Sequence, residues 1–286
     1  MKLSEQAIVA AYLAACLAEL AALKPGNVHV FAAGHGMTTA DFEASARASA
    51  PVMGRPDLSV GARIHAAVEA TRGVIGCNTN LGIVLLCAPL AAAAMLPGGA
   101  LRERLRRVLD RLDVVDAESA FAAIRLAEPG GLGTPPEHDV RRPAAVSLLA
   151  AMKAARDRDR IAYQYATAYA DVFETGIPAY RDSLRRWSAE TWATSATYLE
   201  FLARFPDTHI ARKSGVEAAR RVSAMAEPLA VRLRAPNDPA SLTAELLAFD
   251  AELKAAALNP GTSADLTVAS LFAARLEDAL NDAAMP

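Results

Sequence analysis

Helical periodicity covers most of this chain, and no segment shows the alternation expected of a half-buried β-strand. Alanine, the best helix former, dominates the apolar residues, and small side chains let helices approach closely. We therefore predict an all-α fold: a single large helical domain spanning residues 1–286, with ten to twelve helices around an Ala-rich core. The expected helices are 4–23, 39–52, 58–73, 81–96, 100–111, 116–126, 143–156, 159–174, 178–203, 210–231, 239–257 and 263–281.

The charge balance argues against nucleic acid as a partner, and the composition of one long apolar stretch argues against a membrane span. The formal net charge is −2, so the chain has no electrostatic footprint for nucleic acid. The stretch from Leu81 to Leu101 carries no charge, but it is mostly Ala and contains Gly and Pro. A membrane-spanning helix is normally richer in Leu and Ile, so a buried central helix is the favoured interpretation.

The N-terminus and the cysteines bear on the cellular compartment in which the protein is expected. An apolar run ends in Leu13-Ala14-Ala15-Cys16, which resembles a lipoprotein cleavage site, yet Glu5 interrupts its start and helical spacing continues to Leu23. We favour an amphipathic first helix over a signal peptide. Three cysteines without paired spacing favour a reducing compartment. The expectation is a cytoplasmic protein that binds neither membrane nor nucleic acid.

Short polar loops rich in Gly and Pro separate the predicted helices. Because function concentrates on loops held by a rigid scaffold, we expect them to form the walls of one site. They are residues 24–38, 76–80, 128–142, 205–208 and 258–262.

The first of these loops begins with K-P-G-N-V-H at residues 24–29. Pro and Gly set a fixed turn after a helix. Lys24 can supply a point charge for phosphate, Asn27 an amide and His29 an imidazole. Most K-P-G turns are simply helix stops, so that alternative stays open. His35 is flanked by two glycines, and both a structural and a functional role for it stay open.

A second group of polar side chains precedes the apolar stretch. Asn78, Thr79 and Asn80 lie between two glycines, beside a predicted helix start where free N–H groups and the helix dipole favour anions. Three such side chains are costly to bury unless something pairs with them. We interpret them as ligand-binding residues; the structural alternative is that Asn80 caps the helix.

The loop at 128–142 is glycine-rich and ends in acidic residues. A metal-binding or catalytic carboxylate at Asp139 fits this pattern. The alternative is an ordinary loop followed by a capping residue.

Two further motifs come from the C-terminal half. Asp207-Thr208-His209-Ile210-Ala211-Arg212-Lys213 joins a carboxylate to adjacent cations, a combination suited to a triphosphate. Asn259-Pro260-Gly261-Thr262-Ser263-Ala264-Asp265 offers amides and hydroxyls beside a helix start. We expect Asn259 and Ser263 to contact a phosphorylated ligand, and Asp265 to reach a metal bound at that helix start.

The chain resembles the triphosphoribosyl-dephospho-CoA synthase family through six motifs, and the resemblance extends from about residue 5 to 280. The motifs are K-P-G-N-V-H, N-T-N-L-G-I-V-L-L-C-A-P-L, A-E-P-G-G-L-G, R-D-R-D-x-I-A, P-D-T-H-I-A-R-K and L-N-P-G-T-S-A-D-L. The likeness is to a divergent branch, because the better-known branch has N-T-H-K-G where this chain has N-T-N-L-G at 78–82. The resemblance implies an all-helical transferase of cofactor biosynthesis.

The reaction implied is substitution at the ribose C1′ of ATP, in which adenine leaves and an acceptor hydroxyl, such as that of 3′-dephospho-CoA, attacks. The expected partners are therefore small molecules, with Mg²⁺ neutralising the triphosphate. On this interpretation Asp207, Asp265 and Asp139 are the catalytic carboxylates, and Asp207 and Asp265 also bind the metal. The nucleotide would be held by Lys24, Asn27, His29, Asn78, Thr79, Asn80, Arg212, Lys213, Asn259 and Ser263.

Two other functions remain open at this stage. One is a ribosyl or phosphoribosyl transferase, or related ligase, that uses another acceptor in the synthesis of a methanopterin-type one-carbon cofactor. The other is a helical nucleotide-binding protein without turnover. The oligomeric state also remains open, and a homodimer is one possibility.

Overall fold

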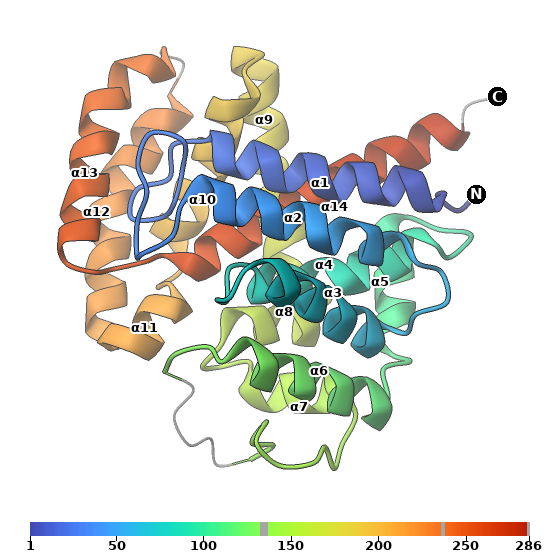
Figure 1. Cartoon of the computed structure of the whole chain (residues 1–286). Coiled ribbons are helices and arrows are strands. Elements are labelled where there is room, and N and C mark those ends of the chain that lie inside the picture. Colours follow the sequence, from blue (N-terminus) through green and yellow to red (C-terminus); the bar gives the residue numbers. More distant parts are fainter. Residues whose placement is uncertain (132–136, 236–237, 285–286) are drawn as a thin grey trace. The chain divides into compact units, whose positions relative to one another are not determined.

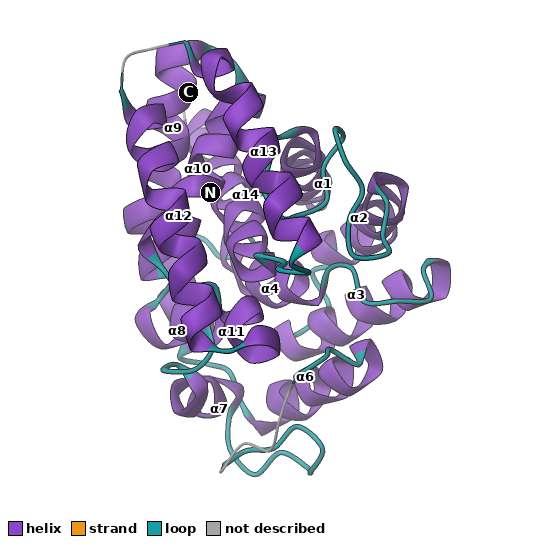
Figure 2. Ribbon diagram, turned by 90° about the vertical axis from the view of Figure 1, so that its left-hand side faces the viewer, coloured by secondary structure: helices purple, strands orange, loops and turns teal. Residues whose placement is uncertain are grey.

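The computed structural model describes residues 1–131, 137–235 and 238–284. Within these ranges there are fourteen α-helices, a π-helix η1 (Val172–Gly176), a 3₁₀ helix η2 (Pro239–Leu242) and no strand (Figures 1 and 2). The all-α prediction is confirmed, with slightly more helices than expected. The helices are α1 (Glu5–Ala21), α2 (Thr39–Gly54), α3 (Val60–Val74), α4 (Leu81–Ala94), α5 (Leu101–Leu109), α6 (Val114–Ala127), α7 (Leu148–Ala155), α8 (Arg160–Thr167), α9 (Ile177–Trp187), α10 (Glu190–Arg204), α11 (Thr208–Ser214), α12 (Val216–Arg234), α13 (Thr243–Ala255) and α14 (Gly261–Ala284).

The extra helices arise where a residue with positive φ interrupts a long helical pattern. Ser188, at φ 52°, ends α9 and separates it from α10 within the predicted helix 178–203. Gly215, at φ 92°, separates α11 from α12 near the start of the predicted helix 210–231. Apolar periodicity continues across both breaks, so the pattern alone does not reveal them.

Contacts within the chain define two compact units. Unit 1 comprises Met1–Ala15, Ala44–Ala170 and Phe272–Pro286, and unit 2 comprises Cys16–Glu43 and Asp171–Leu271. Helices α1, α2 and α14 each contribute residues to both.

Helix α4 lies in the core of unit 1 and packs against α3, α5, α6 and α8. Twelve of its fourteen residues are buried, as predicted for a central helix. Pro89 lacks the N–H that would bond the carbonyl of Leu85. The hydroxyl of Tyr165 replaces that donor at 2.7 Å, and Tyr169 donates to the next carbonyl, Leu86, at 2.9 Å. Both tyrosines are buried, so these bonds satisfy polar groups that water cannot reach.

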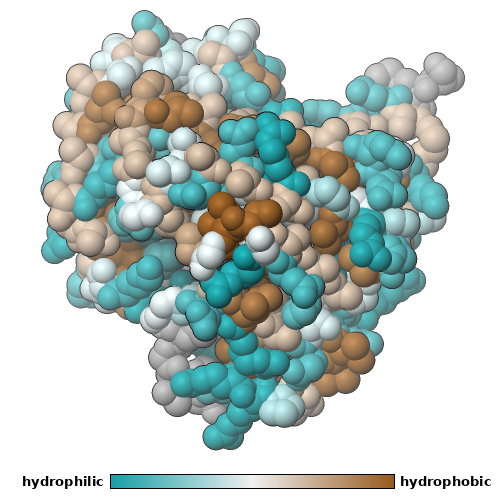
Figure 3. Space-filling model, in the orientation of Figure 1, coloured by the Kyte–Doolittle hydropathy of each residue, from teal (hydrophilic) through white to brown (hydrophobic). Residues whose placement is uncertain are grey.

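No helix in the described part of the chain is long and apolar enough to cross a membrane. On the face drawn in Figure 3, hydrophobic residues occur as small groups among hydrophilic ones.

Unit 2 contains a second core, formed largely by α10, α12 and α13. Tyr198, Leu202, Val222 and Phe249 are among its buried members. The hydroxyl of Tyr198 donates to the carbonyl of Pro25 at 2.6 Å. This core therefore fixes the start of the segment 24–38, which we call the K-P-G loop.

Candidate functional site

Lys24 opens the K-P-G loop, and its side chain is completely buried. The ammonium group pairs with Glu19 and donates to the Asn27 Oδ1 at 3.2 Å. Burial lowers the pKa of Lys24, against the opposing attraction of Glu19, and burial raises the pKa of Glu19. The cation predicted for phosphate is thus directed into unit 2, where it fixes the turn from within.

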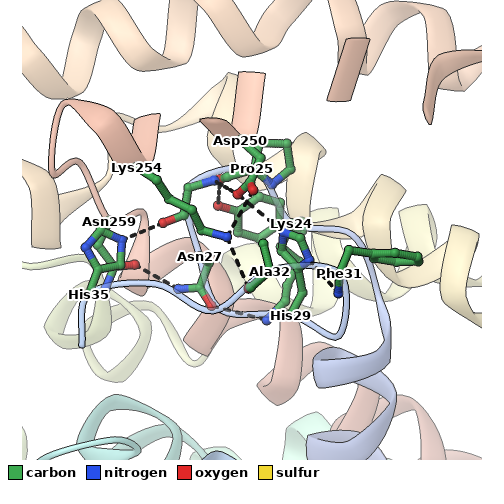
Figure 4. Close-up of polar contacts among 12 residues, drawn as sticks. Lys24, Pro25, Asn27, His29, Phe31, Ala32, His35, Asp250, Lys254 and Asn259 are labelled. Atoms are coloured by element: carbon green, nitrogen blue, oxygen red, sulfur yellow. Dashed lines mark hydrogen bonds and ion pairs between the residues drawn. The ribbon is translucent and has the colours of Figure 1, made fainter. Parts of the chain in front are cut away.

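Asp250 of α13 also holds the K-P-G loop (Figure 4). Its Oδ1 accepts from the Gly26 N–H at 2.8 Å, and its Oδ2 accepts from Lys254 at 3.0 Å. Lys254 also donates to the carbonyl of Ala32 at 3.2 Å. Burial alone would raise the pKa of Asp250, but its bonds to His29, Lys254 and Gly26 prevail and hold that pKa below its ordinary value. Sequence reasoning missed Asp250, because an Asp four residues before a Lys also fits an ordinary surface pair.

His29 is buried within the same loop. Its Nδ1 accepts from the Phe31 N–H at 3.3 Å, and its Nε2 lies 3.2 Å from Asp250 Oδ1. Both ring nitrogens therefore face groups of unit 2. The imidazole orders the loop in the described structure.

Two asparagines from distant motifs meet in unit 2. Asn27 Nδ2 donates to Asn259 Oδ1 at 2.8 Å, which joins the K-P-G loop to the segment before α14. Nearby, His35 Nε2 contacts the carbonyl oxygen of Gly26 at 2.8 Å (Figure 4). The structure thus brings Lys24, Asn27 and Asn259 together within unit 2.

Asp207 connects the N-termini of α11 and α14. Oδ1 accepts from the N–H groups of His209 and Ile210 at 2.9 and 3.1 Å. Oδ2 accepts from the N–H and the hydroxyl of Ser263, both at 2.8 Å. Burial raises the pKa of this carboxyl, and the bonds from Ser263 act against the shift. Through these four hydrogen bonds, the Asp207 carboxylate caps the N-termini of both helices.

His209 is a second residue that sequence reasoning passed over. Its N–H also lies 3.1 Å from Thr262 Oγ1, and its ring packs on Gly261, where an added Cβ would lie 2.9 Å from Nδ1. Burial lowers the pKa of His209 to about 3, and Lys213 and Arg212 add to the shift. The imidazole is therefore neutral near pH 7. Gly261 in the N-P-G-T segment leaves room for this ring. That glycine was the sequence signal that could have pointed to His209.

The remaining predicted residues of unit 2 lie on α11 and α14. Arg212 is half-buried and Lys213 exposed, both in the last turn of α11. Asp265 is half-buried and acts electrostatically on Lys24. Since α14 begins at Gly261, two residues earlier than predicted, its first turn contains no acidic residue. Asp265, which we expected to reach a metal bound at the helix start, therefore lies just beyond the first turn of α14.

The polar motif at 78–80 belongs to unit 1, where each side chain has a partner from that unit. Asn78 Oδ1 accepts from the Leu81 N–H at 3.1 Å, and Thr79 bonds the hydroxyl of Ser45. Asn80 donates to Thr71 Oγ1 at 3.0 Å and makes no side-chain cap bond. The capping role considered for Asn80 is performed by Asn78.

Asp139 is also in unit 1. It accepts from the Arg141 N–H at 3.0 Å and pairs with the Arg141 guanidinium at 2.6 Å. That pairing holds the pKa of Asp139 below its ordinary value. Part of the preceding loop, residues 132–136, lies outside the described residues.

Among the described residues, no group of three or more His, Cys, Asp or Glu side chains could hold a metal ion. A carboxylate that shares a metal with substrate phosphates would not form such a group.

The fold and these contacts define an all-helical protein in which polar loops and the N-terminus of a long helix meet in unit 2. The chain belongs to the CitG family, ATP:dephospho-CoA triphosphoribosyl transferase, whose model matches residues 5–283.

Two relatives support this assignment. A probable 2-(5''-triphosphoribosyl)-3'-dephosphocoenzyme-A synthase from Stutzerimonas stutzeri (strain A1501) is 29% identical over 213 residues, which cover 74% of this chain and 65% of that relative. A crystal structure of a candidate triphosphoribosyl-dephospho-CoA synthase from Archaeoglobus fulgidus is 25% identical, with a TM-score of 0.64. That match covers 82% of this chain and 98% of the Archaeoglobus chain.

Proposed function

We propose that this protein transfers the 5-triphosphoribosyl group of ATP to an acceptor hydroxyl, such as that of 3′-dephospho-CoA, and releases adenine. The observation that carries the proposal is the match of residues 5–283 to the family of that activity. The polar groups gathered in unit 2 support it, because they suit a phosphorylated ligand.

The triphosphate would bind near the α14 N-terminus, where the helix dipole favours anions. The Ser263 N–H at this helix start is already bonded to Asp207. Arg212 and Lys213 would supply positive charge there, since both act electrostatically on His209, whose ring packs on Gly261. We keep Asn259 as an orienting donor, since its Oδ1 is fixed by Asn27 and this directs its amide nitrogen elsewhere. Ser263 and Asp207 would hold these groups in position, because the Ser263 hydroxyl donates a hydrogen bond to the Asp207 carboxylate.

Asp265 is the carboxylate that we assign to the reacting region. Substitution at C1′ passes through a state with oxocarbenium character, which a nearby carboxylate stabilises. Mg²⁺ would be held by the triphosphate oxygens together with Asp265, since Mg²⁺ commonly uses one or two carboxylates plus substrate phosphates. Asp207 fits this role poorly, because its two oxygens already accept four hydrogen bonds.

The test is release of adenine from ATP, followed by chromatography, with 3′-dephospho-CoA as acceptor. Adenine together with a matching triphosphoribosyl product supports the proposal. Adenine release only with another hydroxyl acceptor would retain the transferase chemistry and replace the acceptor. ATP binding without adenine release in the presence of any acceptor would contradict the proposal and favour a binding protein.

A further inference from the structure

His35 occupies a tight turn in the K-P-G loop whose backbone restricts the choice of residue. Gly34 and Met37 exchange two backbone hydrogen bonds, at 3.2 and 3.0 Å. The two central residues, His35 and Gly36, have φ values of 55° and 76°. Positive φ at both central positions is the pattern of a type I′ turn, which favours Asn, Asp or Gly. His35 therefore stands at a position where Asn, Asp or Gly is the usual residue.

The ring of His35 is held at one nitrogen only. Its Nε2 contacts the Gly26 carbonyl at 2.8 Å, and since a carbonyl can only accept, Nε2 carries a proton (Figure 4). The Gly26 peptide is itself fixed, because its N–H donates to Asp250. In the neutral ring, the lone pair is therefore on Nδ1. The side chain is exposed, so Nδ1 is open to a ligand.

The other two histidines of unit 2 are less suited to receive a proton. His29 is buried, with Nδ1 bonded to the Phe31 N–H and Nε2 facing Asp250. His209 is a weak base, because burial and neighbouring cations lower its pKa to about 3. His35 alone combines a fixed ring with an accessible nitrogen among the three.

We propose that His35 is the general base of the transfer reaction, a step that rests on the proposed function. Nδ1 takes the proton of the acceptor hydroxyl while the hydroxyl oxygen bonds to C1′ of the ribose. The electron pair of the breaking C1′–N9 bond leaves with adenine, which takes up a proton from water. His35 then returns its proton to solvent, so the overall exchange is balanced.

Charged and titratable groups lie around this position on two elements, α13 and α11. Lys254 of α13 packs against Gly34, where an added Cβ would lie 2.9 Å from its Cε, and Asp250 acts through the Gly26 peptide. His209 of α11 interacts electrostatically with His35. The Gly26 carbonyl can accept from Nε2 whether the ring is neutral or protonated, so the ring stays in place through the reaction.

The experiment compares His35→Asn with the unaltered protein. Asn suits a type I′ turn but cannot accept a proton, so folding and ATP affinity should be retained while kcat for adenine release falls by about 10²–10⁴-fold. The loss of rate at low pH, caused by protonation of the base, should disappear in the variant. Added imidazole should restore part of the rate.

A matched control is His138→Asn, which replaces a histidine of similar φ, 50°, in unit 1 and should leave kcat unchanged. His35→Gly also suits the turn and provides a second variant if His35→Asn folds poorly. If the unaltered protein releases adenine and His35→Asn does so at the same rate, the base assignment is wrong. If the unaltered protein releases none, the proposed function fails instead.

Discussion

Two polar motifs that look alike in the sequence are used differently in the two units. In unit 1, Asn78, Thr79 and Asn80 bond to Leu81, Ser45 and Thr71, all within that unit. In unit 2, Asn27 and Asn259 bond each other, and an exposed histidine and half-buried charges lie on neighbouring segments. Similar polar motifs therefore hold the start of one helix in unit 1 and join two distant segments in unit 2.

The largest expected effect tests the double cap in unit 2. Asp207→Ala removes four hydrogen bonds and leaves buried N–H groups without an acceptor, so the free energy of unfolding should fall by about 3 kcal/mol. Urea denaturation measures it. The control is Asp159→Ala in unit 1, which caps α8 alone and should cost about 1 kcal/mol. Equal losses would show that Asp207 does not join two helices energetically.

A pH-dependent effect should come from His209. Its pKa is about 3 in the folded protein, against an ordinary value of 6.5, so the unfolded chain binds the additional proton between these pH values. The free energy of unfolding should therefore fall as the pH falls through this window, by at most about 2 kcal/mol between pH 6.5 and 5. His209→Gln should remove this component. Parallel stability curves for the two proteins would contradict the prediction.

A smaller effect is expected for Asp265, the carboxylate that we propose binds Mg²⁺ together with the triphosphate. Asp265→Asn should weaken Mg-ATP binding at least about tenfold, or about 1.4 kcal/mol, while the melting temperature changes little. Titration calorimetry with and without Mg²⁺ measures this, and Asp278→Asn, at an exposed position on the same helix, is the control. A variant that melts early and binds Mg-ATP normally would give Asp265 a structural role.

The smallest effect should come from the motif in unit 1. Asn78→Ala removes the side chain that caps the start of α4, which should cost about 1 kcal/mol of stability. ATP affinity should be unchanged, because the side chains of this motif are engaged within unit 1. A tenfold loss of ATP affinity would place residues 78–80 in the binding site after all.

The sequence predicts the fold well because helical periodicity and alanine content are local properties. It does not reveal the break at Ser188, where a polar residue adopts a left-handed conformation without a glycine to mark it. It predicts a phosphate contact for Lys24 but not the burial of this side chain, because that burial depends on Glu19 and on the packing of α1, which no motif records. Asp250 was missed for a related reason: its partner Gly26 is 224 positions away.

The peptide of Gly26 matters for anyone who wishes to redesign the specificity of this protein. A side chain there would meet Leu253 and Pro260 at 2.8 Å, and its φ of 82° disfavours other residues. A library should therefore hold Gly26 constant. Diversity belongs instead at Val30, whose side chain is exposed on the same loop, since the ring of Phe31 packs against His29.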